Sequence, residues 1–383
     1  MLGEANLIFE GVSYPDLKII TRYPSFKIPL SGGNPLFALV ISYTYTSLIP
    51  GISAAGQNED LIKYTSPADA EFLNYGHCKC LDSVPVTPDG MPTPAIITKT
   101  ALNLSNIPFL IIDAGSVVKP QVPYISFDMN PGNDIRTGNA MDKSYVMKGL
   151  KYGEAFGREL AKLSKTVIIG ESIPGGTTTA LSVLVALGID AWSKMSSSLM
   201  KNPHNLKNRV VKEGMAKAGI SFGCCKNDPE RAIATVGDPM VPVVTGLACG
   251  ISESGSNVML AGGTQMTAII ALISAMKRSL ENICIGTTKY VAEDPSSDIR
   301  GIVNEICSEF PVFAVDLHFE DSKRVGLKAF ANGFVKDGAG AGGLSILAML
   351  KSRGSLTGTS ILRSVETEYD LLTQHSKNDD KMK

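Results

Sequence analysis

Residues 167–181 have the sequence VIIGESIPGGTTTAL, in which an apolar run, a glycine-rich turn, three threonines and an apolar helical pattern follow one another. A buried strand, a glycine turn and a helix N-terminus in this order form an anion site, because backbone N–H groups point at the ligand and the helix dipole favours negative charge. Three threonines exceed what one helix cap needs, although a capped turn without a ligand stays open as the alternative. Glu171 would repel a phosphate, so we expect it to serve another part of a phosphorylated substrate, whose reacting end is polar or cationic.

The same succession of a short apolar run, a turn and a helical pattern recurs along the chain. Strands that alternate with helices predict an α/β fold, a doubly wound, mainly parallel sheet of about six strands with helices on both faces. Functional residues are then expected at the carboxyl ends of the strands. The six runs span residues 36–43, 108–114, 166–170, 258–261, 283–286 and 312–317.

The two ends of the chain lack this alternation. We therefore predict a catalytic core over residues 36–354 and a small helical subdomain formed by residues 1–35 together with 355–375. Residues 357–372 have the pattern of an amphipathic helix. Residues 376–383, which are polar and charged, are predicted to be a disordered tail.

Composition excludes several classes of function. The formal net charge is −1, which gives no electrostatic case for binding nucleic acid or an anionic membrane. Apolar runs are too short or too polar to cross a bilayer. Seven cysteines, an odd number, and no signal peptide predict reduced thiols in a cytoplasmic protein. Four histidines without ligand spacing give no metal site, so none is expected.

A second glycine-rich segment, residues 336–343 with the sequence KDGAGAGG, places a carboxylate, Asp337, directly before a helix start. Its glycines formally satisfy the dinucleotide pattern G-x-G-x-x-G, which keeps a dinucleotide-dependent oxidoreductase open as one alternative. The residues before it are a poor buried strand, and no acidic residue follows a strand about twenty positions on, as a dinucleotide ribose requires. Asp337 could instead be a general base facing a substrate. A third possibility is a closely packed helix with a solvated aspartate.

These segments resemble motifs of the nicotinate-nucleotide:dimethylbenzimidazole phosphoribosyltransferases, and most closely their archaeal-type branch. The stretch 170–178 is similar to the family's Gly-Glu-Met-Gly-Ile-Gly-Asn-Thr-Thr, and 335–341 is similar to Leu-Gly-Glu-Gly-Thr-Gly-Ala. Shorter similarities fall at 51–54, 112–115 and 138–141. The blocks have the family's order from about residue 36 to 350. Each block alone is moderately specific, and the ordered set is strong.

The resemblance implies a homodimer that uses no cofactor and transfers phosphoribose from nicotinate mononucleotide to an aromatic base such as dimethylbenzimidazole. The reaction would release nicotinate and form the α-ribazole phosphate of the cobamide lower loop. It implies that Asp337 is the catalytic base and Glu171 the second carboxylate, and that Ser53 and Thr65 lie in the base pocket. The residues that it places around the phosphate and nucleotide are Gly175, Gly176, Thr177, Thr178, Thr179, Lys207, Gly338 and Gly340.

The departures from the family fall mainly at the base end. Asp337 stands where the family has glutamate and reaches roughly 1.5 Å less, so it could work through a water. The family's Thr-x-Gln-Met stretch is here Thr65-Ser-Pro-Ala68. The acceptor therefore stays open between a benzimidazole, a purine such as adenine and a phenolic compound. A nucleotide-binding protein that kept the phosphate site and lost the chemistry is a further alternative.

Overall fold

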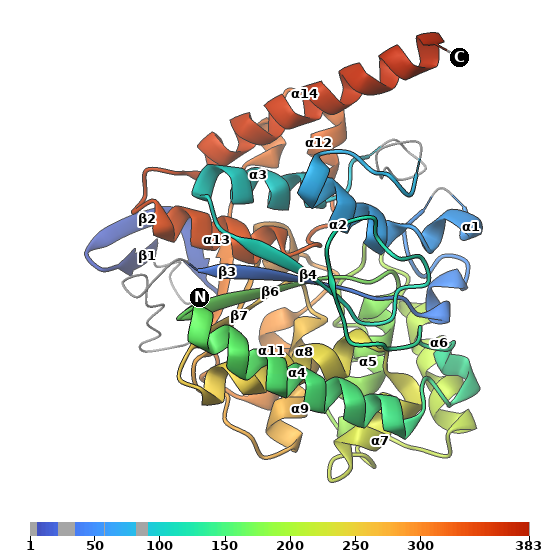
Figure 1. The fold of residues 1–383 in the computed structure, drawn as a ribbon. Helices are drawn as coiled ribbons and strands as arrows, with labels where there is room; N and C mark the ends of the chain where they lie inside the picture. Colours follow the sequence, from blue (N-terminus) through green and yellow to red (C-terminus); the bar gives the residue numbers. More distant parts are fainter. Residues whose placement is uncertain (1–5, 22–34, 57, 82–90, 383) are drawn as a thin grey trace.

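The structure, a computed structural model, describes residues 6–21, 35–56, 58–81 and 91–382. Within them, one sheet has the strand order β1-β2-β9-β8-β7-β6-β3-β4-β5 (Figure 1). All six predicted strands are present, which confirms the α/β fold with a mainly parallel sheet. The strands are β1 (Asn6–Phe9), β2 (Val12–Ile19), β3 (Leu36–Ile41), β4 (Phe109–Asp113), β5 (Ile125–Ser126), β6 (Thr166–Ser172), β7 (Asn257–Ala261), β8 (Ile283–Thr288) and β9 (Val312–Val315).

The sheet is doubly wound from β3. The chain first adds β4 and β5 on one side of β3, and it then returns to place β6 on the other side and continues through β7 and β8 to β9. All these pairings are parallel, with Val40 of β3 beside Glu171 of β6. The direction of winding thus reverses between β3 and β6. In open α/β sheets, ligands bind in the crevice outside the carboxyl ends of strands at such a point.

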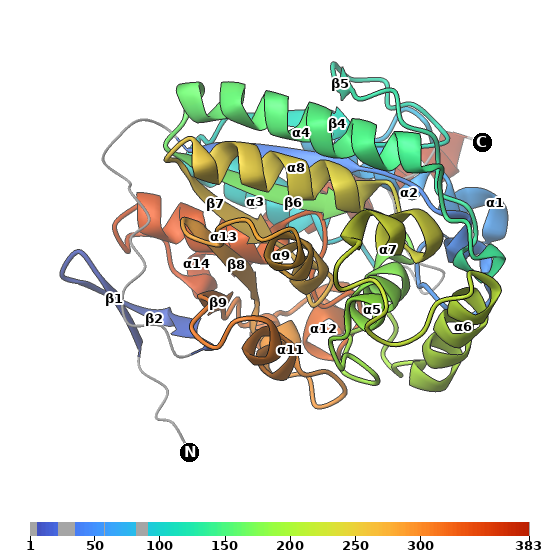
Figure 2. The ribbon, with the colours of Figure 1, turned by 90° about the horizontal axis from the view of Figure 1, so that it is seen from below.

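Helices cover both faces of the sheet (Figures 1 and 2). Alternate residues of β3 therefore enter two cores: Ala38 and Val40 pack with α4 and α8, whereas Leu39 packs with α3 and α13. Burial on both faces explains why the strand sequences are continuously apolar. The helices are η1 (Tyr45–Leu48), α1 (Glu59–Ile62), α2 (Thr65–Tyr75), α3 (Ala95–Ser105), η2 (Ile135–Thr137), α4 (Lys143–Leu163), α5 (Gly176–Leu187), α6 (His204–Lys217), α7 (Pro229–Val236), α8 (Met240–Glu253), α9 (Met266–Ala275), α10 (Lys289–Ala292), α11 (Ile299–Ile306), η3 (Phe319–Asp321), α12 (Val325–Ala331), α13 (Ala341–Lys351) and α14 (Gly358–Met382).

Helices α4 and α8 pack against each other through glycines spaced four residues apart. A Cβ atom added to Gly153 of α4 would lie 2.5 Å from the carbonyl oxygen of Val243. One added to Gly250 of α8 would collide with the carbonyl oxygen of Glu154. The two backbones are therefore in direct contact, which side chains on this stripe would prevent.

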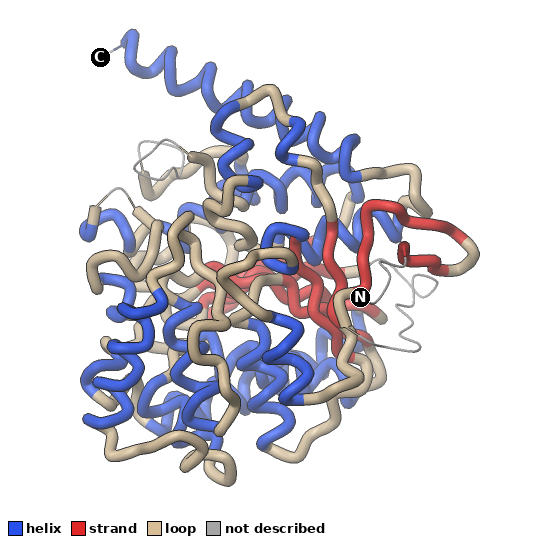
Figure 3. The backbone as a smooth tube through the Cα atoms, turned by 180° about the vertical axis from the view of Figure 1, so that it is seen from behind, coloured by secondary structure: helices blue, strands red, loops and turns tan. Residues whose placement is uncertain are grey.

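The N-terminal hairpin and the start of α14 meet beside β9. Strands β1 and β2 form a hairpin, and β2 continues the sheet antiparallel to β9 (Figure 3). Asp16 of β2 accepts hydrogen bonds from the Gly358 N–H at the start of α14 (2.8 Å) and from His318 (2.9 Å). The described N-terminal residues are thus strands of the main sheet, whereas the sequence predicted a helical subdomain there; residues 1–5 and 22–34 lie outside the described residues.

Helix α14 packs on α3 and continues through residue 382 (Figure 1). The disordered tail predicted for residues 376–383 is thus helical as far as Met382, and Lys383 lies outside the described residues. Among the helices that the structure describes, none has both the length and the apolarity needed to cross a bilayer.

Candidate active site

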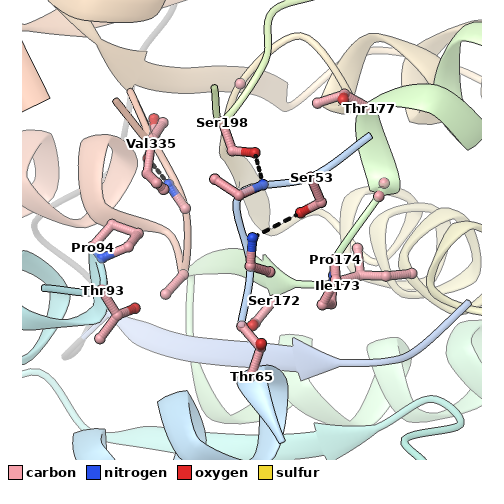
Figure 4. A pocket seen from close by; sticks show the side chains of 18 of the residues that line it. Ser53, Thr65, Thr93, Pro94, Ser172, Ile173, Pro174, Thr177, Ser198 and Val335 are labelled. Atoms are coloured by element: carbon pink, nitrogen blue, oxygen red, sulfur yellow. Dashed lines mark hydrogen bonds between the residues drawn. The ribbon is translucent and has the colours of Figure 1, made fainter. Parts of the chain in front are cut away.

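A pocket lies at the carboxyl ends of β3 and β6, where the winding of the sheet reverses (Figure 4). The space between its walls, including the open mouth, is about 1290 Å³. Eight of the residues predicted from the sequence line it: Ser53, Thr65, Glu171, Gly175, Gly176, Thr177, Asp337 and Gly338.

The turn from β6 into α5 forms one end of the pocket. Gly175 is the N-cap of α5 and has φ +81°, a left-handed conformation that glycine adopts without strain. A Cβ atom on Gly176 would lie 3.0 Å from the side-chain oxygen of Gln265, the residue before α9. The N-termini of α5 and α9 therefore converge at this end. Their dipoles favour an anion there, and the half-buried Thr177 offers a hydroxyl.

The other four residues predicted to bind the phosphate or nucleotide lie behind the pocket wall. Thr178 and Thr179 are fully buried in α5, and the Thr179 hydroxyl donates to Asp238 (2.5 Å). Gly340 has φ +80° and packs against Phe37 at the start of α13. Lys207 is also fully buried. Within the described residues, these four support the site rather than line it.

Two buried lysines bind a wall of three serines, residues 196–198: Lys207 lies behind it, and Lys336 lines the pocket beside it. The Lys207 ammonium donates to the carbonyl oxygen of Ser196 (2.6 Å), and the Lys336 ammonium donates to that of Ser197 (3.2 Å). Lys336 also lies 3.2 Å from Asp294. Burial, followed by the charge of Lys336, lowers the pKa of Lys207 to about 7. Sequence analysis did not select Lys336, although it directly precedes Asp337 in the glycine-rich segment.

Asp337 is held by four hydrogen bonds. One oxygen accepts from the N–H groups of Gly338 (2.8 Å) and Gly342 (3.2 Å), and the other accepts from the Thr287 hydroxyl (3.0 Å) and the Thr288 N–H (3.2 Å). A carboxylate has about four acceptor positions, so all of them are used. Burial nevertheless raises the pKa of Asp337 to about 6. The side chain thus presents a fixed negative charge to the pocket.

Glu171 is buried at the carboxyl end of β6, with 5% of its surface exposed. Its carbonyl oxygen accepts from the N–H of Ala339 (3.0 Å), which brings it next to the 336–343 segment. Burial raises the pKa of Glu171 well above its usual value, and the charges of Asp337, Asp238 and Asp69 raise it further, against a backbone N–H at Ile173. This carboxyl therefore holds a proton more strongly than an ordinary glutamate does.

Asp69 is a third pocket carboxylate, and sequence analysis missed it. It lies on α2 one turn after Thr65, so the two residues share a helix face. It accepts hydrogen bonds from the hydroxyls of Thr93 (2.6 Å) and Ser172 (2.7 Å), and burial raises its pKa to about 6. The i, i+4 spacing from a predicted base-pocket residue was the signal available in the sequence.

The predicted base-pocket residues Ser53 and Thr65 lie in the same part of the site (Figure 4). The Ser53 hydroxyl accepts from the Ala55 N–H (3.1 Å), and the Ala54 N–H donates to Ser198 (3.0 Å). These bonds fix the 52–56 loop against the serine wall. Residues from the start and the middle of the chain thus close one side of the pocket.

Asp238, behind the pocket, gives a test of the buried charges. Burial raises its pKa from 3.8 to about 6, so its contribution to stability is complete below pH 4 and is lost as the pH rises through 6. We expect Asp238→Asn, which does not titrate, to gain stability relative to the wild type between pH 4 and 7. The expected gain is of the order of 3 kcal/mol. Thermal melts of both proteins across this range measure it; a constant difference between the two melting temperatures would contradict the expectation.

Two other candidate sites are a dinucleotide fingerprint at residues 338–343 and a possible metal cluster at Asp316, His318 and Glu320. Residues 332–340, before α13, form a loop rather than a strand, so the glycines at 338–343 lack the strand that a dinucleotide fingerprint requires. Asp316, His318 and Glu320 are close enough to share a metal ion. The Lys289 ammonium already lies 2.8 Å from Asp316 and 2.6 Å from Glu320, so a resident cation satisfies these carboxylates.

Comparisons with known proteins agree with this geometry. A family model described as "Phosphoribosyltransferase" (DBI_PRT) matches residues 102–293. A "UPF0284 protein" of Methanothermobacter thermautotrophicus is 45% identical over 83% of this chain and 88% of its own length, and one of Archaeoglobus fulgidus is 45% identical over 90% and 96%. The crystal structure of a nicotinate-nucleotide-dimethylbenzimidazole phosphoribosyltransferase from Thermus thermophilus has the same fold, with a TM-score of 0.58, 16% identity, and coverage of 86% of this chain and 83% of that one. The chain belongs to this phosphoribosyltransferase family and is a phosphoribosyltransferase.

Proposed function

We propose that this phosphoribosyltransferase takes its ribosyl group from nicotinate mononucleotide and transfers it to an aromatic base. The observation that carries the proposal is one pocket that contains both the paired N-termini of α5 and α9 and the carboxyl groups of Glu171 and Asp337. The helix N-termini suit the 5′-phosphate, and the carboxyl groups suit the positive charge that develops on the ribose when nicotinate leaves. The product would be the α-ribazole phosphate of a cobamide lower loop or its analogue.

The hydrogen bonds favour a division of roles between the two carboxylates. The sequence assigns the general base to Asp337, but all its acceptor positions are occupied. We infer that Glu171 takes the proton of the attacking ring nitrogen, since burial and the neighbouring charges raise its pKa and so its affinity for a proton. Asp337 then acts through its fixed negative charge, which strengthens the hold of Glu171 on that proton. Nicotinate leaves from C1′ as the ring nitrogen bonds to the opposite face.

The direct test is an incubation of the purified protein with nicotinate mononucleotide, with and without candidate bases. We expect nicotinate release only when a base is present, together with a new ribosylated product in equal amount. Binding of the mononucleotide without turnover against every base would contradict the proposal and favour a non-catalytic nucleotide-binding protein. A dinucleotide-dependent rise in melting temperature, unmatched by mononucleotides, would favour an oxidoreductase.

We further propose that the enzyme acts as a cytoplasmic homodimer, as the resemblance implies. Exposed aromatic side chains such as Tyr45 and Tyr152, which are 43% and 52% exposed, support an interface between two copies. Measurement of the molar mass in solution tests the oligomeric state. A monomer that retains full turnover would contradict it.

A further inference from the structure

Three carboxyl groups, those of Asp69, Glu171 and Asp337, line the pocket. Asp69 accepts a hydrogen bond (2.7 Å) from the hydroxyl of Ser172, which is the residue after Glu171. The N–H of Ala339, two residues after Asp337, donates to the carbonyl oxygen of Glu171 (3.0 Å). Short hydrogen-bonded links thus join α2, β6 and the glycine-rich segment, and all three carboxyl groups line the pocket.

A second set of contacts connects Asp69 with the glycine-rich segment 336–343. The Thr93 hydroxyl donates to Asp69 (2.6 Å), and a Cβ atom on Gly338 would lie 2.8 Å from the ring of Pro94. Figure 4 shows Thr93 and Pro94 across the pocket from Thr177, which begins the phosphate end. Asp69 therefore lies at the end where the accepting base must bind if the phosphate is held by α5.

Asp69 has unused capacity to accept hydrogen bonds. Each of its two oxygens accepts one hydrogen bond from a hydroxyl group. About two of its four acceptor positions are therefore open. Only 4% of its surface is exposed. Lys336, the one cationic side chain among the described lining residues, is already bound to Asp294 and to the Ser197 carbonyl oxygen. A ligand with N–H donors would complete the surroundings of this buried carboxylate.

We propose that Asp69 selects the acceptor by accepting a hydrogen bond from an amino group on its ring, so that the acceptor is an amino-substituted azole of the aminopurine class. This inference rests on the proposed function. The methyl groups of dimethylbenzimidazole would leave the two remaining acceptor positions of this buried carboxylate without a donor, which is costly. A phenol supplies a single donor, and its oxygen is the atom that must attack.

The test compares adenine with dimethylbenzimidazole as acceptors, at saturating nicotinate mononucleotide. We expect the wild type to have the higher kcat/KM with adenine. Asp69→Leu should lower the ratio of kcat/KM for adenine to kcat/KM for dimethylbenzimidazole by about 10- to 100-fold, the effect of one charge-assisted hydrogen bond, whereas an effect through Glu171 would act on both acceptors alike. Asp69→Asn, which keeps the shape and an acceptor oxygen, should give an intermediate loss.

Glu71→Gln is the matched control. Glu71 lies on the same helix and is fully buried, but it accepts the backbone N–H groups of Lys79, Cys80 and Gln121 and does not line the pocket. Its replacement should lower the melting temperature without changing the ratio of the two acceptors. A wild type that prefers dimethylbenzimidazole, or an acceptor ratio that Asp69→Leu leaves unchanged, would overturn the inference. Failure of every acceptor in the wild type would instead overturn the proposed function.

Discussion

Glu171→Gln is expected to lower kcat for nicotinate release by about 10²–10⁴-fold, the usual contribution of a positioned general base. Glutamine keeps the size of the buried side chain and cannot take up a proton. Binding of nicotinate mononucleotide should remain close to that of the wild type, because the phosphate end of the pocket is unchanged. Single-turnover rates and a binding titration of the same preparation measure the two quantities separately.

The partner variant Asp337→Asn separates the two possible bases. If Glu171 takes the proton, removal of the neighbouring charge lowers its pKa, and the acid limb of the pH–rate profile should move to lower pH while turnover persists. If Asp337 is the base, as the sequence assigned it, Asp337→Asn should instead abolish turnover and Glu171→Gln should retain much of it. Thermal melts of both variants exclude a simple loss of folding.

Gly250→Val is expected to cost the fold at least about 4 kcal/mol, which is a large part of the stability of an ordinary domain. The added side chain would meet the carbonyl oxygen of Glu154, so no change of rotamer relieves the collision and α4 and α8 must separate. The protein should be insoluble or should melt many degrees lower. Chemical denaturation of any soluble fraction gives the change in the free energy of unfolding.

Ala155→Val on the exposed side of α4 is the matched control. It introduces the same side chain into the other helix of the α4–α8 pair, on the side away from α8, and only the lower helix propensity of valine applies, about 0.7 kcal/mol or less. If Gly250→Val were as stable as Ala155→Val, the direct backbone contact between α4 and α8 would be wrong.

The sequence predicted the central sheet well because β3, β6 and β7 are buried on both faces, so their apolar runs stand out from the turns. It did not predict β2, in which buried and exposed residues are mixed and Pro15 and Asp16 weaken the strand pattern. It also missed the two-residue β5, which is held only by its pairing with β4. Such elements depend on the neighbours that they meet after folding.

For the site, local motifs indicated the residues that belong to one turn, such as Gly175 and Thr177. They could not indicate that the Asp69 oxygens would meet Ser172, more than one hundred residues further along the chain. Nor could they show that Lys207 lies behind the serine wall rather than in the pocket. These arrangements follow from the packing of α2 against the sheet and of α6 against α5 and α7, which a single sequence does not specify.

The reversal of winding between β3 and β6 has a consequence for how this enzyme can diversify. The gap it opens is bordered on one side by the β6–α5 turn, whose glycines are fixed by backbone packing, and on the other by α2 and the 92–94 segment. Residues such as Thr65 and Asp69 contact the gap from a helix outside the sheet, so their replacement leaves the strand cores intact. If Asp69 contacts the acceptor as proposed, changes at Thr65 and Asp69 in α2 alter the acceptor site without altering the β6–α5 turn that is proposed to hold the donor.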